Sequence, residues 1–290
     1  MICSPDMPAD TTPAGGERRR LDIAVTDAGL AESRARAQAL ILGGGIRVAG
    51  TVMTKPGTLV AGTERIELVT QPLPYVSRGG LKMRHALDTF AIDPRGLVVA
   101  DVGASTGGFS DALLQRGAAR IYAIDVGYGQ LAWKLRIDPR VVVMERTNIR
   151  SVESLPEAVD LAVVDVSFIS LELVLPPVQR LLRPSAECVA LIKPQFEAGR
   201  RQVGKKGVVR DPGLWSEVIR RVAHHAGSSG WTVTGLTRSP ITGPAGNVEF
   251  LLRLQFASAQ AAFPLDAATE AVTGIALVTR MHSSPDAAPG

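Results

Sequence analysis

The sequence is poor in cysteine and lacks long apolar runs. Its 290 residues include two cysteines, Cys3 and Cys188, so neither a disulfide framework nor a cysteine metal site is expected. No apolar run approaches the ~20 residues that span a bilayer, and the N-terminus lacks the apolar segment of a signal peptide. We therefore expect a soluble, cytoplasmic protein that binds no metal.

A strong charge bias is also absent from the chain as a whole. Lys and Arg number 32 against 28 Asp and Glu, a formal excess of four. Residues 17–95 hold twelve of these cations and eight of the acids, which accounts for the whole excess. This distribution favours a small basic module that docks on phosphates, although a solvated helical face would carry the same charge.

The hydrophobic pattern divides the chain into five parts. Residues 1–16 and 258–290 have little periodic hydrophobicity, so we expect a disordered N-terminus and a flexible C-terminal tail. A small α+β domain is predicted over residues 17–70, a linker over 71–78, and a larger α/β domain over 79–257. No internal repeat is evident.

Within the small domain, two short helices precede short strands. Apolar residues from Leu21 to Ala28 fall at helical spacing and end at Gly29. Ser33 is placed to cap a second helix over residues 33–43. Strands are expected around "IRVAG" and "ERIELV", with "KPG" as a turn between them.

The order of residues in this module is similar to that of the S4 RNA-binding domain. "RLDIAVTDAGLAESRARAQALILGGGIRVAG" has the Arg-Leu-Asp opening, the Ser-Arg pair at the second helix and the glycine turn into a short strand. Ala49 stands where the family often has Asn. The resemblance implies recognition of structured RNA through shape and phosphate contact. The candidate RNA-binding residues in and after this module are Arg18, Arg20, Arg34, Arg36 and Arg78.

From about Val98 onward, strand-like and helix-like runs alternate. Near-continuous Val, Ile and Leu runs are typical of strands that are buried on both faces. The final two runs, "WTVTGLTRSPI" and "NVEFLLRLQF", have no helix between them and should pair antiparallel. The prediction is a doubly wound, Rossmann-like α/β domain with a mostly parallel seven-stranded sheet. The other strand runs are "LVVADVG", "RIYAIDV", "VVVMER", "DLAVVDV" and "CVALIK", and the helical runs include "VESLPEA" and "LELVLPPVQRLL".

The stretch "VVADVGASTGGFSDALL" predicts a cofactor loop. Its glycines allow backbone to approach a ligand closely, and the helix that follows offers free N–H groups. The spacing is not the G-x-G-x-x-G of dinucleotide enzymes, which argues against the alternative of an oxidoreductase. It resembles motif I of the methyltransferases that use S-adenosylmethionine (SAM). The candidate cofactor residues of this loop are Asp101, Gly103, Ala104, Ser105, Thr106, Gly107, Gly108 and Phe109.

Three further residues are candidates for the same site. Asp125 ends the second strand, where an open sheet places an acid against a ribose diol, although an Asp there can also be structural. Asn148, after the third strand, is a candidate adenine contact. Asp165, after the fourth strand, borders the same crevice.

Four ionisable residues occupy positions where burial would be unfavourable: Lys82, Asp165, Lys193 and Glu249. Asp165 and Lys193 each close a parallel strand, so topology should bring them together beside the cofactor. Such a set suits attack by a weakly acidic hydroxyl on a methyl sulfonium. We expect Lys193 to accept or steer the hydroxyl proton, with Lys82 as the second cation; Asp165 would orient Lys193, and Glu249 would position a lysine or the ribose.

Together these motifs resemble the TlyA family of ribosomal RNA methyltransferases, called hemolysin A in older naming. "VSRGGLKM", "ASTGGF", "DVGYGQL", "ERTNIR", "DVSFIS", "KPQFE" and "GNVEF" carry the resemblance, which covers about residues 18–256. It implies an S4-like domain followed by an RrmJ/FtsJ-like, SAM-dependent methyltransferase domain. The implied reaction is 2'-O-methylation of cytidine in 16S or 23S rRNA, or in both, by a Lys-Asp-Lys-Glu tetrad at the four positions above.

A glycine-rich basic loop follows Lys193. "EAGRRQVGKKGVVRDP" brings five cations to the cofactor edge, and a phosphate clamp is the functional interpretation of them. Four of them are candidate RNA-binding residues: Arg200, Arg201, Lys205 and Lys206. Two other functions stay open, an RNA-binding assembly factor with an inactive methyltransferase fold and a membrane-active hemolysin.

Overall fold

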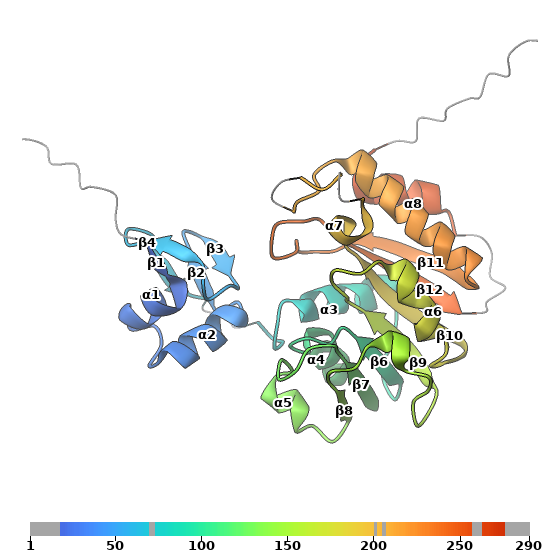
Figure 1. Cartoon of the computed structure of the whole chain (residues 1–290), viewed down its shortest axis with the longest axis horizontal. Coiled ribbons are helices and arrows are strands. Elements are labelled where there is room, and N and C mark those ends of the chain that lie inside the picture. The colour runs from blue at the N-terminus through green and yellow to red at the C-terminus, as the bar shows by residue number, and fades with distance from the viewer. Residues whose placement is uncertain (1–17, 70–72, 200–201, 205–206, 257–262, 276–290) are drawn as a thin grey trace, which may run out of the picture. The chain divides into compact units, whose positions relative to one another are not determined.

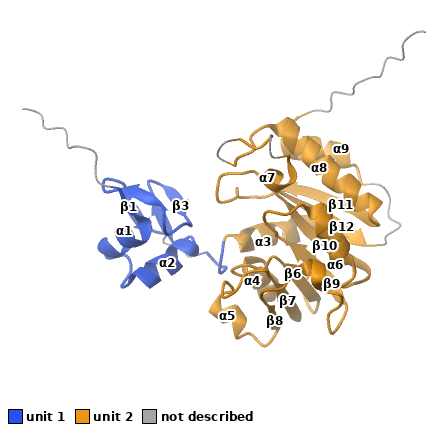
Figure 2. Cartoon of the chain, viewed as in Figure 1, with its two compact units in different colours: residues 1–77 blue, residues 78–290 orange. Residues whose placement is uncertain are grey.

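The computed structural model describes residues 18–69, 73–199, 202–204, 207–256 and 263–275. The chain divides into two compact units, residues 1–77 and residues 78–290 (Figure 2). The predicted N-terminal segment 1–16 and most of the predicted tail lie outside the described residues.

Unit 1 is a small α+β fold built around one apolar core. Leu21, Val25, Ala37, Ile41 and Ile46 are fully buried in it. Ser33 accepts a hydrogen bond from the backbone N–H of Arg36, as its predicted role as a helix cap requires. The elements are β1 (Arg18–Arg20), α1 (Leu21–Asp27), α2 (Arg34–Leu42), β2 (Ile46–Val48), β3 (Thr51–Met53), β4 (Leu59–Ala61) and β5 (Ile66–Leu68).

The strands of unit 1 form two small sheets. β1 pairs with β4, and β2 lies between β3 and β5, all antiparallel. Two strands were predicted here. All five are three residues long, too short for an alternating pattern to identify each of them in the sequence.

Unit 2 contains a seven-stranded sheet in the order β11-β12-β10-β9-β6-β7-β8 (Figure 1). The neighbours from β10 to β8 run parallel, and β12 is antiparallel to both β10 and β11. The strands are β6 (Val98–Val102), β7 (Arg120–Ile124), β8 (Val141–Met144), β9 (Val159–Val164), β10 (Leu182–Ile192), β11 (Trp231–Arg238) and β12 (Phe250–Phe256). The predicted fold class, with its mostly parallel sheet, is confirmed.

Helices α6 and α8 pack on the sheet through Val178, Val218 and Ile219, all fully buried. Helix α8 begins at Pro212, which suits the first helical position, and Asp211 caps it by accepting a hydrogen bond from the N–H of Gly213. The helices of this unit are α3 (Gly79–Phe90), α4 (Gly108–Gln115), α5 (Trp133–Arg136), α6 (Leu175–Gln179), α7 (Pro194–Glu197), α8 (Pro212–Ser228) and α9 (Leu265–Thr273), with short 3-10 turns at Ile149–Ser151 and Leu171–Leu173.

Three predicted segments differ from the structure. The predicted helix over 152–158 is wrong: these residues form an irregular connection, and Pro156 would remove a hydrogen bond from any helix there. The predicted helix over 171–182 is a 3-10 turn followed by the five-residue α6, and β10 already starts at Leu182. Part of the predicted flexible tail is helix α9, because Leu265 and Val272 pack against the core.

Candidate active site

Lys193 and Asp165 meet at the carboxyl ends of neighbouring parallel strands. Asp165 directly follows β9 and Lys193 directly follows β10, so the register of the sheet places them side by side. Nζ of Lys193 lies 2.5 Å from Oδ1 of Asp165 and donates a hydrogen bond of 3.0 Å to Oγ of Ser167. The predicted proximity of Lys193 and Asp165 is therefore what the structure shows.

Lys82 and Glu249 form a second ion pair, which is more deeply buried. Nζ of Lys82, in helix α3, lies 2.6 Å from Oε2 of Glu249, which directly precedes β12. Their side chains are 9% and 1% exposed. Gly243 packs so closely on this pair that a Cβ atom there would lie 2.5 Å from Oε1 of Glu249. Because β12 is antiparallel, its first residues lie at the same sheet edge as the ends of β9 and β10.

The two ion pairs are electrostatically one cluster. Burial by itself would raise the pKa of Asp165, but the positive charges of Lys82 and Lys193, with the Lys193 hydrogen bond, outweigh burial and lower this pKa below its ordinary value. Asp165 thus stays ionised between two cations. The structure brings together all four residues predicted from the sequence.

A cavity of about 440 Å³ opens beside Asp165 along the ends of β6, β7 and β9. Five of the predicted cofactor residues line it: Gly103, Ser105, Asp125, Asn148 and Asp165. Sequence reasoning missed the other polar and apolar walls, which include Val126, Gln130, Thr147, Ile149, Ser167, Phe168, Ile169 and Val174. Ser167 and Phe168 come two and three residues after Asp165. Their position just after the end of β9 is the feature of the sequence from which they could have been predicted to line the cavity.

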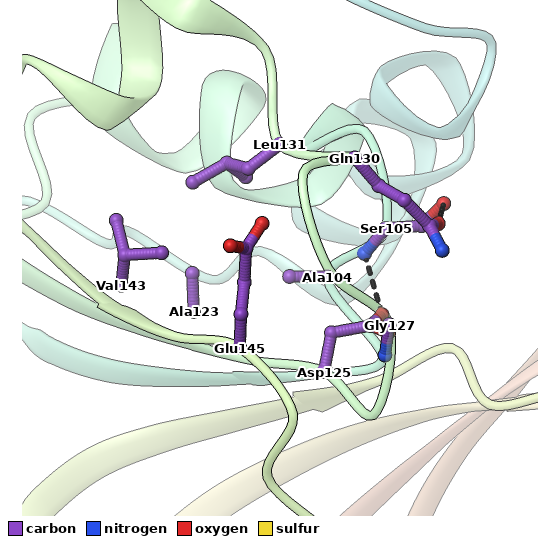
Figure 3. Close-up of a pocket in the computed structure, with 9 residues that line it drawn as sticks. All are labelled: Ala104, Ser105, Ala123, Asp125, Gly127, Gln130, Leu131, Val143 and Glu145. Atoms are coloured by element: carbon purple, nitrogen blue, oxygen red, sulfur yellow. Dashed lines mark hydrogen bonds between the residues drawn. The ribbon is translucent and has the colours of Figure 1, made fainter.

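Asp125 organises the glycine-rich loop on one side of this cavity. Its Oδ2 accepts a hydrogen bond of 2.8 Å from the N–H of Ser105, and its Oδ1 accepts one of 2.7 Å from the N–H of Gly127. Figure 3 shows the hydrogen bond from Ser105 to this carboxylate at one side of a small cavity that Glu145 also lines. Glu145, which sequence reasoning missed, receives a hydrogen bond from Arg136 that lowers its pKa.

The glycines of the loop are required mainly by packing within the protein. A Cβ atom at Gly103 would lie 2.6 Å from the backbone oxygen of Asp165, and one at Gly107 would lie 2.2 Å from a methyl group of Leu135. Both residues also have positive φ angles, 86° and 91°. The prediction that these glycines make room for a ligand is therefore incomplete, because protein atoms already occupy the space next to them.

Asp101 is fully buried and caps helix α4. Its Oδ2 accepts hydrogen bonds from the N–H and the hydroxyl of Ser110, while Oδ1 is buried with no hydrogen-bond partner among the described residues. Burial raises the pKa of Asp101 to about 7, against the hydrogen bonds from Ser110 and with help from the charges of Asp165 and Asp125. Ala104, Thr106, Gly107, Gly108 and Phe109, also predicted, lie in the same loop and helix start but do not line the larger cavity.

Asn148 lines the cavity and also has a structural role. Its Oδ1 accepts a hydrogen bond from the N–H of Arg150 and so caps the 3-10 turn after β8. An exposed aromatic residue stands at the other side of the cavity: Phe168 is 90% exposed, has a φ angle of +65° and lies 4.8 Å from the ring of Phe196, measured between centroids. A further depression of about 510 Å³ adjoins these two rings.

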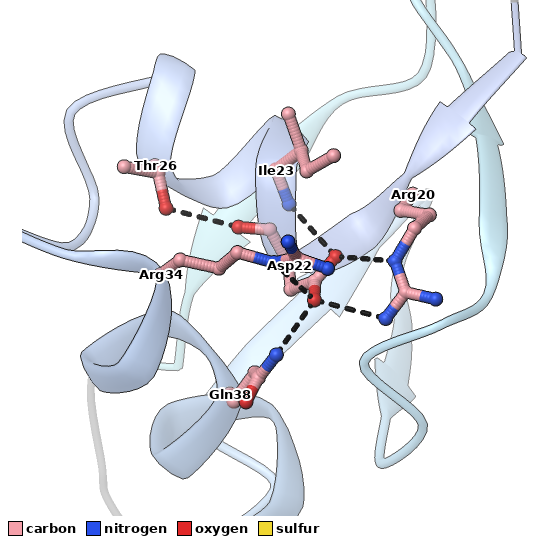
Figure 4. A network of polar contacts seen from close by, with 6 residues as sticks. All are labelled: Arg20, Asp22, Ile23, Thr26, Arg34 and Gln38. Atoms are coloured by element: carbon pink, nitrogen blue, oxygen red, sulfur yellow. Dashed lines mark hydrogen bonds and ion pairs between the residues drawn. The ribbon is translucent and has the colours of Figure 1, made fainter.

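In unit 1, two of the predicted RNA-binding arginines hold a buried carboxylate (Figure 4). Arg20 and Arg34 both form ion pairs with Asp22, at 3.0 and 2.9 Å, and Gln38 donates a further hydrogen bond to it. The hydrogen bonds from Arg20 are the largest cause of the lowered pKa of Asp22. Both guanidinium groups remain about half exposed, so they bind Asp22 and still face solvent.

The other predicted RNA-binding residues differ from one another in setting. Arg18 and Arg36 are exposed on unit 1. Arg78, in unit 2, donates a hydrogen bond of 2.6 Å to the backbone oxygen of Thr242, so it joins the start of α3 to the loop before Glu249. Arg200, Arg201, Lys205 and Lys206 lie outside the described residues.

Comparison with known proteins identifies both units. The FtsJ-like methyltransferase profile matches residues 75–256 and the S4 domain profile matches residues 19–66. A Bacillus subtilis protein named as a candidate rRNA methyltransferase, YqxC, is 47% identical over 246 residues, which are 83% of this chain and 86% of that protein. The 16S/23S rRNA (cytidine-2'-O)-methyltransferase TlyA of Mycobacterium tuberculosis is 48% identical over 241 residues, covering 82% of this chain and 90% of TlyA.

A solved structure is similar over most of the chain. The structure of a Streptococcus thermophilus protein named as a candidate hemolysin is 40% identical, has a TM-score of 0.71, and covers 89% of this chain and 94% of that one. The oxidoreductase alternative is wrong, because the matching profile is that of methyltransferases. The resemblance read from the sequence is confirmed: the chain belongs to the TlyA family of methyltransferases, in which an S4 domain precedes an FtsJ-like domain.

Proposed function

We propose that the protein is a SAM-dependent methyltransferase that methylates the 2'-oxygen of cytidine in ribosomal RNA, of one subunit or of both. The observation that carries the proposal is the pair of lysine–carboxylate contacts at the strand ends, beside a cavity of the right size for a cofactor. The name of the Mycobacterium tuberculosis relative supports the choice of atom, base and RNA.

The cavity residues fit SAM. The carboxylate of Asp125 is placed for a ribose diol, as at the same position of other doubly wound sheets. Ile124, Ile149 and Val174 give the cavity apolar walls that suit an adenine ring, and Asn148 lies on the same wall for its polar edge.

Bound SAM would supply a methyl group on a positively charged sulfur. The acceptor hydroxyl gains this methyl group and loses its proton. Asp165 and Ser167 fix the position of Nζ of Lys193, which steers that proton as an ammonium or accepts it in its neutral form. The negative charge of Asp165 borders the cavity, so the same carboxylate orients Lys193 and faces the cationic cofactor.

Lys82 provides the second positive charge. Its ion pair with Glu249 holds Lys82 in the interior near Asp165. The positive charges of Lys82 and Lys193 both lower the pKa of Asp165. In this position Lys82 stabilises the negative charge that develops on the attacking oxygen. Most of the rate gain would come from holding the hydroxyl in line with the methyl group.

The RNA would contact both units. Arg18 and Arg36 of unit 1 are exposed and free to approach phosphates, and an S4 domain is an RNA-binding module. Phe168, exposed at the cavity rim, offers a ring on which the base of a displaced nucleotide can stack.

The two alternatives have less support. An inactive assembly factor has no need of four buried or half-buried charges paired beside a cavity. For the membrane-active alternative, no helix among the described residues is long and apolar enough to cross a membrane.

The test is methyl transfer from labelled SAM to purified ribosomal subunits and to naked rRNA, followed by mapping of ribose methylation. We expect label at the 2'-oxygen of cytidine. Label on a base, or none with any rRNA substrate, would refute the proposed function.

A further inference from the structure

Asn247 is a buried amide that joins two loops of the active-site edge. Asn247 is 2% exposed and lies two positions before Glu249 in the chain. Its Oδ1 accepts a hydrogen bond of 2.9 Å from the N–H of Val209, and its Nδ2 donates one of 2.9 Å to the backbone oxygen of Gly207. The side chain therefore bonds to both ends of a short segment that follows Lys193 in the chain.

The amide satisfies both partners at once. The segment offers one donor, the N–H of Val209, and one acceptor, the oxygen of Gly207, so a carboxylate would lack the donor and an apolar side chain would lack both groups. The backbone oxygen of Asn247 in turn accepts a hydrogen bond of 2.8 Å from the N–H of Gly243, the residue that packs on Glu249. One residue thus fixes the loop that delivers Glu249 and the segment that lies against it.

The segment 207–210 is buried and hydrogen-bonded at Val209, whereas the residues at its two ends are exposed. Val209 is 3% exposed, and its backbone oxygen accepts a hydrogen bond of 3.2 Å from Nε1 of Trp215. Gly207 and Arg210 are both exposed. The guanidinium of Arg210 is therefore carried on a backbone that Asn247 and Trp215 hold in place, which limits the entropy lost when it binds an anion.

We propose that Asn247 is a positioning residue for the RNA substrate: it holds the segment 207–210 against the loop that leads to Glu249, so that Arg210 contacts a backbone phosphate near the target ribose. This proposal rests on the proposed function, because it requires RNA as the substrate. It assigns Asn247 a role in RNA binding although its own side chain is buried and uncharged.

The sharpest test is the salt dependence of RNA binding. Removing one cation that contacts a phosphate lowers the slope of log K against log salt by about one. We expect Arg210→Ala to show this change, and Asn247→Ala to show the same change although no charge is removed. Ser216→Ala is the matched control, since Ser216 is a buried polar residue in α8 whose hydroxyl bonds to Thr273, away from these loops. It should leave the slope unchanged.

A double-mutant cycle in methyl transfer completes the test. We expect each single substitution to raise KM for rRNA about tenfold, the loss typical of one or two hydrogen bonds, with kcat nearly unchanged. The double variant should be no worse than either single one. Asn247→Ser, whose neutral hydroxyl keeps one hydrogen-bonding group for this segment, should fall between wild type and Asn247→Ala, and it serves as the test variant if Asn247→Ala does not fold.

The outcomes separate the two proposals. If wild-type protein transfers no methyl group to RNA, the proposed function fails before Asn247 is tested. If wild type is active but the effects of Asn247→Ala and Arg210→Ala multiply, or the loss at Asn247 is in kcat with an unchanged salt slope, Asn247 does not act through the RNA contact and the inference is wrong.

Discussion

Nζ of Lys82 lies 2.6 Å from Oε2 of Glu249, in an ion pair that joins helix α3 to the start of strand β12. Glu249 is 1% exposed, so the pair is shielded from water. Removing one member of such a pair leaves a buried charge without its partner, which costs far more than the loss of an exposed pair.

Glu249→Gln should therefore affect both stability and catalysis. We expect a loss of about 3–5 kcal/mol in the free energy of unfolding and a fall of about 10²-fold or more in methyl transfer. Denaturant unfolding and single-turnover assays measure these two effects. Asp88→Asn, in the helix that carries Lys82, is the matched control, because its pair with Arg116 is about half exposed and should contribute less than ~1 kcal/mol. Equal effects of the two substitutions would show that the burial of the Lys82 pair is unimportant.

Gly243→Ala should lower activity without touching any charged residue. Its Cβ atom would lie 2.5 Å from Oε1 of Glu249, so the carboxylate must move away and lengthen its contact with Lys82. We expect methyl transfer to fall at least about tenfold, as small misplacements of catalytic groups do. Gly227→Ala, where a Cβ atom meets nothing within 4 Å, is the control and should be active. Full activity of the Gly243 variant would mean that Glu249 needs no fixed position.

Asp101 makes stability depend on pH near neutrality. Burial raises the pKa of this carboxyl to about 7, whereas in the unfolded chain it is about 3.9. The native state therefore binds the proton more tightly, and the stability that Asp101 contributes is fully present below about pH 4 and is lost as the pH rises through 7. Asp101→Asn should flatten this decline, measured by urea unfolding at several values between pH 5 and 8. An identical pH profile in wild type and variant would contradict the raised pKa.

In unit 1, Arg36 is a cleaner probe of RNA binding than Arg34. Arg34 forms an ion pair with the buried Asp22, so Arg34→Glu places two carboxylates together and should destabilise the unit. Arg36 is exposed, and Arg36→Glu should weaken association with rRNA and flatten its salt dependence while unit 1 stays folded. Arg95→Glu, an equal charge change on an exposed residue just before β6, is the control. Unchanged RNA binding in the Arg36 variant would show that Arg36 does not take part in substrate recognition.

How far the sequence predicts this molecule depends on the range of the interactions. Asp165 and Lys193 could be placed together because each ends a buried parallel strand, and parallel strands share one edge. The direct pairing of Lys82 with Glu249 could not be derived in this way: the two residues come from a helix and from the antiparallel strand, so strand topology does not place them together, although both belonged to the predicted set of four.

Other features depend on contacts that no local pattern records. The burial of Asp22 under Arg20 and Arg34 follows from the packing of α1 on α2. These three charged residues look like surface residues in the sequence, but they form a network that stabilises unit 1. The space next to Gly103 is filled by the backbone of Asp165, which comes from a neighbouring strand. Helix α9 was missed because its short apolar face gains its stability from packing on α8 and β11 rather than from its own sequence.

The most direct test of the account is Lys193→Ala, assayed for methyl transfer to rRNA and, in parallel, for SAM binding. Lys193 is held by Asp165 and Ser167 at the cavity edge, so its loss should abolish transfer, by about 10³-fold or more, while the affinity for SAM changes little. A variant that binds SAM and methylates the ribose at the wild-type rate would contradict the account.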